Sequence, residues 1–249
     1  NSYLYLCFIL PRQPLKLYNL DNLKVIYIHI MLVFLITALA LLTPISLATK
    51  VLEKERQALV DLFHSANGHG WRRSDNWLTS KSICTWYGVS CSQSNTSVVQ
   101  FSLYDNLLDG TIPDSLSALS ALNYFALSTN KLRGNIPSTL GSTFQNVKYF
   151  DLRYNFLNGT FPEMLSTMKS LTHLVLANNA FTDNGNLDKI VQDMKNLTYF
   201  DVRSNHIEGP APESLCALTN LTYCGLINPK YHTNEFVNIP ACLKSRCIV

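Results

Sequence analysis

The stretch VKYFDLRYNFLNGTFPEMLSTMKS, residues 147–170, is one copy of a pattern that recurs about every 24 residues. The other copies begin at Val98, Leu122, Leu171 and Leu197, and a truncated copy begins at Leu221. Each copy has apolar residues at its first, fourth and sixth positions, an Asn at its ninth and another apolar residue at its eleventh. This alternation predicts one short strand per copy. Because one copy cannot bury its apolar face alone, the pattern predicts stacked copies around a continuous core.

Parallel stacking of these strands places equivalent positions of successive copies in columns. Two apolar columns are expected inside the stack: Phe101, Phe125, Phe150, Leu174 and Phe200, and Leu103, Leu127, Leu152, Leu176 and Val202. The ninth positions form a third column: Asn106, Asn130, Asn155, Asn179 and Asn205. A buried amide must satisfy its donors and its acceptor. We therefore expect these asparagines to bind backbone groups of adjacent coils, which is a structural role.

Glycine and proline follow the Asn at regular distances in four of the copies. The glycines are Gly110, Gly134, Gly159 and Gly209, and the prolines are Pro113, Pro137, Pro162 and Pro212. Gly permits a turn, and Pro fixes an extended backbone. The resulting spacing, L-x-x-L-x-L-x-x-N-x-L-x-G-x-I-P, resembles plant-type leucine-rich repeats over residues 98–228. The resemblance implies an α/β solenoid: a right-handed superhelix with a parallel concave sheet, five full repeats, a partial sixth, and disulfide-bearing caps at both ends.

The residues ahead of the repeats predict a cap for the first coil. EKERQALVDLFHSA, residues 53–66, places its apolar residues on one helical face, and Asn67 and Gly68 form a stop signal. Three tryptophans follow, the last inside CTWYGVSC, residues 84–91. The order W...NW...C-x-W-x-G-V-x-C resembles the amino-terminal cap of plant-type leucine-rich repeats, which we place at residues 49–97. A cap of this kind covers the apolar end of the solenoid.

Six of the seven cysteines cluster at the two ends of the repeat region. They are Cys84, Cys91, Cys216, Cys224, Cys242 and Cys247. Cysteines in this arrangement predict end disulfides in an exported chain. We expect the first two to pair, while the other four, in a carboxy-terminal cap that includes residues 229–249, allow three connectivities. Zinc binding and redox chemistry are weaker alternatives, because neither end offers paired C-x-x-C knuckles.

Four N-glycosylation sequons fit the same oxidising compartment. Their acceptors are Asn95, Asn158, Asn196 and Asn220. Together with the cysteines they predict a disulfide-bonded glycoprotein.

An apolar run from Val25 to Ala48 precedes the cap. Two interpretations stay open: a signal peptide at residues 31–48, or an uncleaved anchor that tethers the protein to a membrane. A helix break expected at Pro44 and the small-residue end at Ala48 favour cleavage. Residues 1–30 carry no motif and are interpreted as translated upstream sequence or as the cytosolic flank of an anchor. Both interpretations place the remainder in the secreted fraction or at the extracellular face of the plasma membrane.

The charge is nearly balanced. The chain has 20 Lys and Arg against 17 Asp and Glu, a net charge of +3. No run of like charge is longer than Arg72-Arg73. Since a surface that follows nucleic-acid phosphates needs a basic stripe, we expect no nucleic-acid partner.

Residues between the internal columns are expected on the concave face. Their rows are Gln100, Tyr124, Tyr149, His173, Tyr199 and Tyr223; Ser102, Ala126, Asp151, Val175, Asp201 and Gly225; and Tyr104, Ser128, Arg153, Ala177, Arg203 and Ile227. The candidate ligand-binding residues are Tyr124, Tyr149, Asp151, Arg153, His173, Tyr199, Asp201, Arg203 and Tyr223. Tyr and Arg commonly anchor interfaces. Two alternatives remain: stacked tyrosines stabilise a sheet without any ligand, and the Asp and Arg side chains form solvated ion pairs.

An enzyme is not expected. His173 lies one coil away from Asp151 and Asp201, but no nucleophile, cofactor loop or metal cluster accompanies it. The sequence therefore predicts no catalytic residue, no metal site and no cofactor.

Copy four departs from the pattern. Asp183 replaces the Gly, and the coil is two residues longer than the 24-residue copies. Leu187, Ile190 and Met194 at helical spacing predict a short helix on the convex side. We interpret this departure as repeat drift, with a partner site as the alternative.

Through its repeat frame and amino-terminal cap, the sequence resembles ectodomains of plant receptor-like proteins and polygalacturonase-inhibiting proteins. The resemblance implies an extracellular recognition module that binds a protein, a peptide or a polysaccharide on its concave face, or that works with a receptor partner. Inhibitor contact residues do not carry over, because concave positions vary independently of the repeat frame. The alternative function is that of a self-associating structural or adhesive surface glycoprotein.

Overall fold

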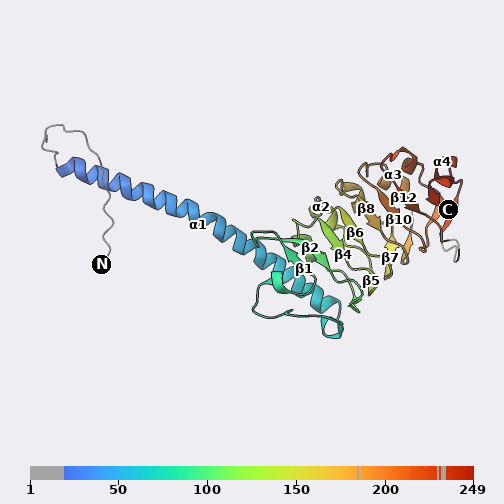
Figure 1. Ribbon diagram of the computed structural model, residues 1–249, viewed down its shortest axis with the longest axis horizontal. Coiled ribbons are helices and arrows are strands. Elements are labelled where there is room, and N and C mark those ends of the chain that lie inside the picture. Colours follow the sequence, from blue (N-terminus) through green and yellow to red (C-terminus); the bar gives the residue numbers. More distant parts are fainter. Residues whose placement is uncertain (1–19, 184, 229, 231–233) are drawn as a thin grey trace. The chain divides into compact units, whose positions relative to one another are not determined.

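The computed structural model describes residues 20–183, 185–228, 230 and 234–249 (Figure 1). The backbone divides into two compact units, Asn1–Leu47 and Ala48–Val249. The interpretation of residues 1–30 lies, for residues 1–19, outside the described residues.

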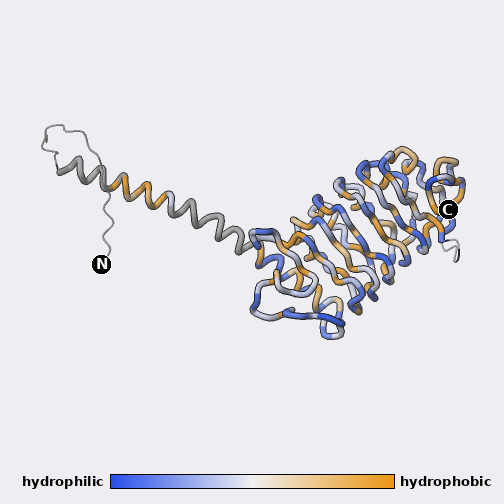
Figure 2. The backbone as a smooth tube through the Cα atoms, viewed as in Figure 1, coloured by the Kyte–Doolittle hydropathy of each residue, from blue (hydrophilic) through white to orange (hydrophobic). Residues whose placement is uncertain are grey.

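Helix α1 (Leu20–Ser65) contains the apolar run of the first unit. It continues through Pro44, so the predicted break is wrong. A proline inside a helix removes one backbone hydrogen bond, but it does not end the helix here. The apolar side chains of residues 30–36 are exposed. Figure 2 colours the described part of this helix as hydrophobic. Among the described residues, no helix is both long and apolar enough to cross a membrane. The side chain of Ala48 is not described, and cleavage there stays a prediction.

The amino-terminal cap of the second unit is built on the last turns of α1. The predicted apolar face is buried: Ala58, Leu59, Leu62, Phe63 and Ala66. The chain leaves the helix at Asn67, whose φ of 55° is left-handed, as expected for a helix stop. Short 3-10 turns follow at η1 (Gly68–Gly70) and η2 (Ile83–Thr85).

Three buried tryptophans join this cap to the first coil. Trp71, Trp77 and Trp86 pack in sequence, with 4.9 Å between the ring centroids of each neighbouring pair. The Trp77 ring centroid lies 6.3 Å from that of Phe101 in the internal column. The tryptophans thus continue the core of the solenoid into the cap, and a disulfide joins Cys84 to Cys91 beside them.

The repeats form one long concave sheet of eight strands. In spatial order these are β1 (Val89–Cys91), β2 (Val98–Ser102), β4 (Tyr124–Ala126), β6 (Tyr149–Asp151), β8 (His173–Val175), β10 (Tyr199–Asp201), β12 (Tyr223–Gly225) and β14 (Cys247–Ile248). The pairs are parallel except that of β1, the cap strand, which lies antiparallel to β2. Equivalent positions of successive copies are in register. The predicted fold is confirmed, and the partial sixth copy supplies β12.

The interior follows the repeat pattern. Every residue of the two apolar columns has 0% exposure. The column of asparagines from Asn106 to Asn205, here called the asparagine ladder, links neighbouring coils by hydrogen bonds. The Asn130 amide donates to the carbonyls of Leu103 and Leu127, and its Oδ1 accepts from the backbone N–H groups of Asn106 and Leu108. Such bonds satisfy backbone groups that the turn would otherwise bury unpaired. The predicted structural role of these asparagines is confirmed.

The ladder has a sixth member that the sequence analysis missed. Asn234 is buried, accepts from the backbone N–H groups of Asn205 and Ile207, and donates to the carbonyls of Val202 and Leu226. It was missed because the sixth copy inserts residues between its strand and its Asn, which displaces the amide from the ninth position.

A second set of strands, which the sequence analysis did not predict, follows the Asn of each coil. Four of them pair in one sheet: β3 (Asp109–Gly110), β5 (Lys131–Gly134), β7 (Phe156–Thr160) and β9 (Ala180–Thr182). Another two pair separately: β11 (Glu208–Pro210) and β13 (Glu235–Val237). These strands are two to five residues long, and four of the six contain a turn glycine. The Gly residues hide the alternation by which a strand is recognised in sequence.

Short helices line the convex side. They are η3 (Asp114–Ala118), α2 (Thr139–Thr143), η4 (Glu163–Thr167), α3 (Leu187–Val191) and η5 (Glu213–Ala217). The predicted convex helix of copy four is α3, and its apolar residues Leu187 and Ile190 are buried, as is Met194 just beyond it. Asp183 explains the departure of this copy, because its carboxylate accepts from the backbone N–H groups of Asn186 and Leu187 at the start of α3.

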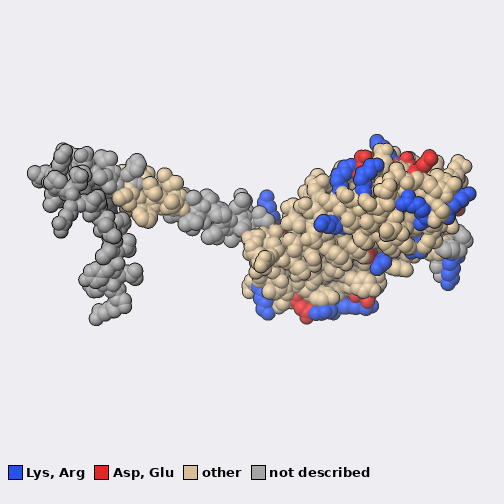
Figure 3. Space-filling model, turned by 45° about the horizontal axis from the view of Figure 1, so that its top comes forward, with Lys and Arg blue, Asp and Glu red and all other residues tan. Residues whose placement is uncertain are grey.

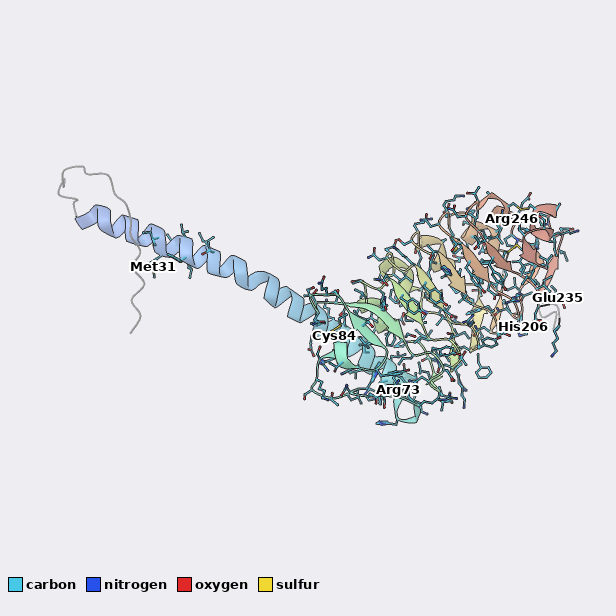
Figure 4. All side chains as sticks on the ribbon, in the orientation of Figure 1. Met31, Arg73, Cys84, His206, Glu235 and Arg246 are labelled. Atoms are coloured by element: carbon cyan, nitrogen blue, oxygen red, sulfur yellow. A yellow bond between two sulfur atoms is a disulfide. The ribbon has the colours of Figure 1, made fainter. Side chains whose placement is uncertain are left out.

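The carboxy-terminal cap closes the other end of the second unit (Figure 4). Disulfides join Cys216 to Cys242, at the start of α4 (Ala241–Lys244), and Cys224 to Cys247 in β14. The Arg246 guanidinium donates to the carbonyls of Cys216, Leu218 and Leu221. Of the three connectivities left open by the sequence, the structure has this one.

Candidate ligand-binding face

Five aromatic rings form a continuous stack along the concave sheet. This aromatic ladder consists of Tyr124, Tyr149, His173, Tyr199 and Tyr223, one ring from each of five consecutive strands. Successive ring centroids lie 4.6, 5.4, 5.7 and 4.2 Å apart. Each ring is half-buried, so one part of it packs against its neighbours and another faces solvent.

The ladder follows directly from the strand register. Its members occupy the third position of each copy, and the sheet pairs Tyr124 with Tyr149, Tyr149 with His173, and His173 with Tyr199. Parallel strands lie about 4.8 Å apart, which is close to the preferred separation of offset-stacked rings. Stacking therefore restricts the positions that the rings can take.

The first of two Asp–Arg sets lies beside Tyr149. The Asp151 carboxylate is buried and accepts from the Ser128 hydroxyl at 3.2 Å, the Tyr149 hydroxyl at 3.3 Å and the backbone N–H of Arg153 at 3.1 Å. Its Oδ2 lies 3.4 Å from Nε of Arg153, whose side chain is 38% exposed. Asp151 thus binds its neighbours while shielded from solvent, whereas the Arg153 side chain is partly exposed.

The second set, two coils further along, is more tightly paired. Nε and Nη2 of Arg203 donate to the two carboxylate oxygens of Asp201 at 2.9 and 2.8 Å, a bidentate pair. The arginine side chain is 29% exposed and the aspartate side chain 4%. The guanidinium carbon also lies 5.6 Å from the centroid of the Tyr223 ring.

Gly225 makes room for this second pair. A Cβ atom at this position would lie 2.7 Å from both Arg203 Nε and Asp201 Oδ1. The glycine therefore permits the close approach of the guanidinium to the sheet. The sequence analysis placed Gly225 and Ser128 in the concave rows but not among the candidate site residues, because their contribution is visible only from the neighbouring coil.

Burial and the aspartates raise the pKa of the ladder tyrosines. Burial, followed by the charge of Asp151, raises the pKa of Tyr149 to about 12. Burial, followed by the charge of Asp201, raises the pKa of Tyr223 to about 12. Both phenols are therefore neutral hydrogen-bond donors at neutral pH. Burial also raises the pKa of Asp151, although hydrogen bonds from Arg153, Ser128 and Tyr149 and the charge of Arg153 oppose this rise.

The structure places all nine candidate residues on the concave side and divides them into two kinds. The ladder rings and the two arginines are partly exposed, whereas Asp151 and Asp201 are 2% exposed. The view that the Asp and Arg side chains form solvated ion pairs is wrong for the carboxylates, because the arginines and tyrosines cover them. Between the two sets, Val175 and Ala177 are small and buried.

Other features of the second unit lie away from this face. The sequon acceptors Asn95, Asn158, Asn196 and Asn220 are exposed, and none lies in a strand of the concave sheet. An open groove between η4 and α3 is lined by Glu163, Met164, Asn186 and Lys189 on the convex side. Acidic and basic side chains are interspersed among uncharged ones on the face drawn in Figure 3.

The described residues contain no group of three or more His, Cys, Asp or Glu side chains placed to hold a metal ion. The His173 ring lies in the aromatic ladder, with its Nδ1 3.0 Å from the Thr172 hydroxyl oxygen. These contacts position the ring as a stacking partner.

Parallel coils, a buried asparagine ladder and a disulfide-locked tryptophan cap define a leucine-rich-repeat protein. The family comparisons agree: the model of the leucine rich repeat N-terminal domain matches residues 52–92, and that of the leucine rich repeat matches residues 146–168 and 196–218. The chain is a leucine-rich-repeat protein with a plant-type amino-terminal cap.

Similar proteins include plant receptor kinases. A probable inactive receptor kinase of Arabidopsis thaliana is 36% identical over 91 residues, which cover 36% of this chain and 14% of that protein. The inactive LRR receptor-like serine/threonine-protein kinase BIR2 of the same species is 42% identical over 59 residues, or 23% of this chain and 10% of BIR2. The matched regions thus span only a small part of these relatives.

Among solved structures, the crystal structure of the BIR2 ectodomain from Arabidopsis thaliana is similar to this chain. The sequence identity is 26% and the TM-score 0.62, and the match covers 75% of this chain and 95% of that ectodomain. The similarity therefore extends over nearly the whole of that ectodomain.

Proposed function

We propose that this protein is an extracellular recognition module whose concave face binds a peptide or a segment of a partner protein. The observation that carries the proposal is the aromatic ladder, a half-exposed stack of five rings flanked by two arginines. Interfaces concentrate their binding energy in Tyr, Trp and Arg side chains that are already rigid. The concave face carries Tyr and Arg side chains, and stacking and ion pairing already restrict their motion.

The buried aspartates support this role by fixing the arginines. An arginine loses side-chain entropy when it is immobilised at an interface. Asp201 removes part of this cost in advance, because its bidentate pair already holds Arg203 in one orientation.

Three observations support an extracellular location. Disulfides close both caps, and such bonds persist in oxidising compartments. The exposed sequon acceptors leave the concave strands free of attached sugar. The similar BIR2 structure is itself an ectodomain. Partnership with a receptor kinase and secretion through a cleaved leader are part of this proposal.

The test is differential capture. The second unit, secreted from plant cells, is used as bait for apoplastic peptides and proteins, in parallel with a Tyr149→Ala/Tyr199→Ala double variant. We expect partners that the parent retains and the double variant loses, whereas the control Thr182→Ala, an exposed change on β9, retains them. Equal capture by all three baits contradicts the proposal. Light scattering separates this function from the self-association alternative, which predicts dimers or larger species of the parent.

A further inference from the structure

Among the described residues of the second unit, Phe156 is the most exposed large apolar one, at 61%. It begins β7, whose sequence Phe156-Leu157-Asn158-Gly159-Thr160 contains a complete N-glycosylation sequon. The repeat frame does not require an apolar residue here, because the equivalent positions of the adjacent coils hold Lys131 and Ala180. The repeat therefore does not explain this exposed ring, which offers an apolar surface to a neighbouring group.

The strand geometry places the sequon acceptor beside this ring. Residues two apart on a strand point to the same face, about 7 Å apart along the backbone. Leu157, between them, is buried, and both Phe156 and Asn158 are exposed. The Asn158 register partner on β9 is Ala180, whose small side chain leaves space on that side. Within the described part of the chain, the Asn158 side chain makes no hydrogen bond.

The backbone around the sequon is held in place. Gly159 has a left-handed φ of 84°, and a Cβ there would collide with the side chain of Asn135 on the preceding coil. The glycine thus fixes the turn that follows Asn158, and β7 pairs with β5 on one side and β9 on the other. Phe156 and Asn158 are therefore presented on a rigid sheet and not on a loose loop.

We propose that Phe156 is the packing platform for the first N-acetylglucosamine of a glycan on Asn158. In N-glycosylation the Asn nitrogen bonds to the anomeric carbon of the sugar, the bond from that carbon to a lipid diphosphate breaks, and one amide proton is released. One face of the sugar ring carries C–H groups with slight positive charge, which complement the negative face of an aromatic ring. The stack removes the exposed apolar ring from water.

The other three sequons provide a contrast. Two residues before their acceptors lie Gln93, Met194 and Leu218. The Met and Leu side chains are buried in the core, and Gln93 is exposed but not aromatic. Among the four sequons, Asn158 alone combines an exposed aromatic side chain with the position that faces the sugar.

This inference rests on the proposed extracellular route, and the test separates the two. The chain is expressed in a secretory plant or insect cell as parent, Phe156→Ala, Thr160→Ala and the double variant. Thr160→Ala removes the sequon but keeps Asn158. Glycopeptide mass spectrometry measures occupancy at each acceptor, and thermal unfolding measures Tm. Gln93→Ala, at the matched position before Asn95, is the control.

We expect Asn158 to be occupied and the glycan to raise Tm by about 2 to 4 °C when Phe156 is present. In the Phe156→Ala background this gain falls to less than half, and Phe156→Tyr restores it. Gln93→Ala leaves both occupancy at Asn95 and Tm unchanged. An equal gain in the Phe and Ala backgrounds overturns the inference, as does an empty Asn158 beside occupied Asn95, Asn196 and Asn220. If all four acceptors are empty, the extracellular route fails and the inference fails with it.

Discussion

Two side-chain ladders, one polar and one aromatic, arise from single positions of the same repeat. The asparagines face inward and exchange hydrogen bonds with the backbone of the preceding coil and of their own coil. The ring side chains face outward and stack on each other. The first ladder is needed for the fold, because its loss leaves buried backbone groups unpaired. The second contacts solvent and is available for binding.

Replacing Asn130 by Ala should therefore be severely destabilising. The change leaves the N–H groups of Asn106 and Leu108 and the carbonyls of Leu103 and Leu127 without their side-chain partner. We expect the free energy of unfolding to fall by about 3 kcal/mol or more, measured by urea denaturation. The control His206→Ala, an exposed neighbour of Asn205, should change stability by less than about 0.5 kcal/mol. Similar stability of both variants would contradict the role of the ladder.

Glu55 predicts a dependence of stability on pH. This carboxyl group is fully buried, both of its oxygens accept from the Val98 backbone N–H, and burial raises its pKa from 4.5 to about 7. Between pH 4.5 and 7 the folded protein binds more protons here than the unfolded chain. Its contribution to stability is thus fully present at low pH and is lost as pH rises through 7.

We expect the free energy of unfolding to decrease from pH 5 to pH 7.5 by up to about 3 kcal/mol through this group. Glu55→Gln keeps an acceptor but cannot ionise, so its stability should lose this part of the decrease. Denaturant titrations at both pH values measure the difference between parent and variant. A decrease of the same size in both proteins would exclude Glu55 as its source.

The elements outside the repeat pattern are explained by local contacts. In copy four, Asp183 stands where other copies have Gly, and its carboxylate accepts from two backbone N–H groups at the start of α3. The antiparallel β1 joins the cap to the sheet, and β14 continues it at the other end. Asp183, β1 and β14 thus each provide hydrogen-bond partners for backbone groups that the regular repeat pattern does not pair.

Replacing Asp183 by Ala should destabilise the fourth coil. The backbone N–H groups of Asn186 and Leu187 lose their acceptor, and we expect a loss of about 1 kcal/mol, as for other helix caps. Hydrogen exchange at the start of α3 measures the effect locally. Asp183→Asn, which keeps one acceptor oxygen, should lose less. If protection at α3 is unchanged in Asp183→Ala, the carboxylate does not cap this helix.

The repeat frame made most of the fold predictable. Periodic spacing identified both apolar columns, five ladder asparagines and the concave rows, since each depends only on position within a copy. Contacts between non-equivalent positions of different copies could not be predicted from the repeat spacing. Asn234 was missed because an insertion displaced it, and the burial of Asp151 and Asp201 was missed because it depends on the tyrosines, Ser128 and Gly225 in neighbouring coils.

In the proposed function, stability and recognition depend on different parts of the solenoid. Its core, asparagine ladder and caps lie within or at the ends of the stack, while the aromatic ladder and the arginines occupy one face. Core and face substitutions should therefore have different effects. Leu152→Ala, which removes fully buried methyl groups, should lower the free energy of unfolding by about 2 to 5 kcal/mol.

The most direct measurement of the central claim compares Kd and Tm for Tyr149→Ala, Arg153→Ala, Tyr199→Ala and Arg203→Ala against a captured partner. The account predicts stability losses of about 1 kcal/mol or less for each variant and a loss of binding free energy of about 2 kcal/mol or more for at least one of them. Four stable variants that all bind like the parent would contradict it. That result would place recognition elsewhere, with the convex groove between η4 and α3 as the next surface to test.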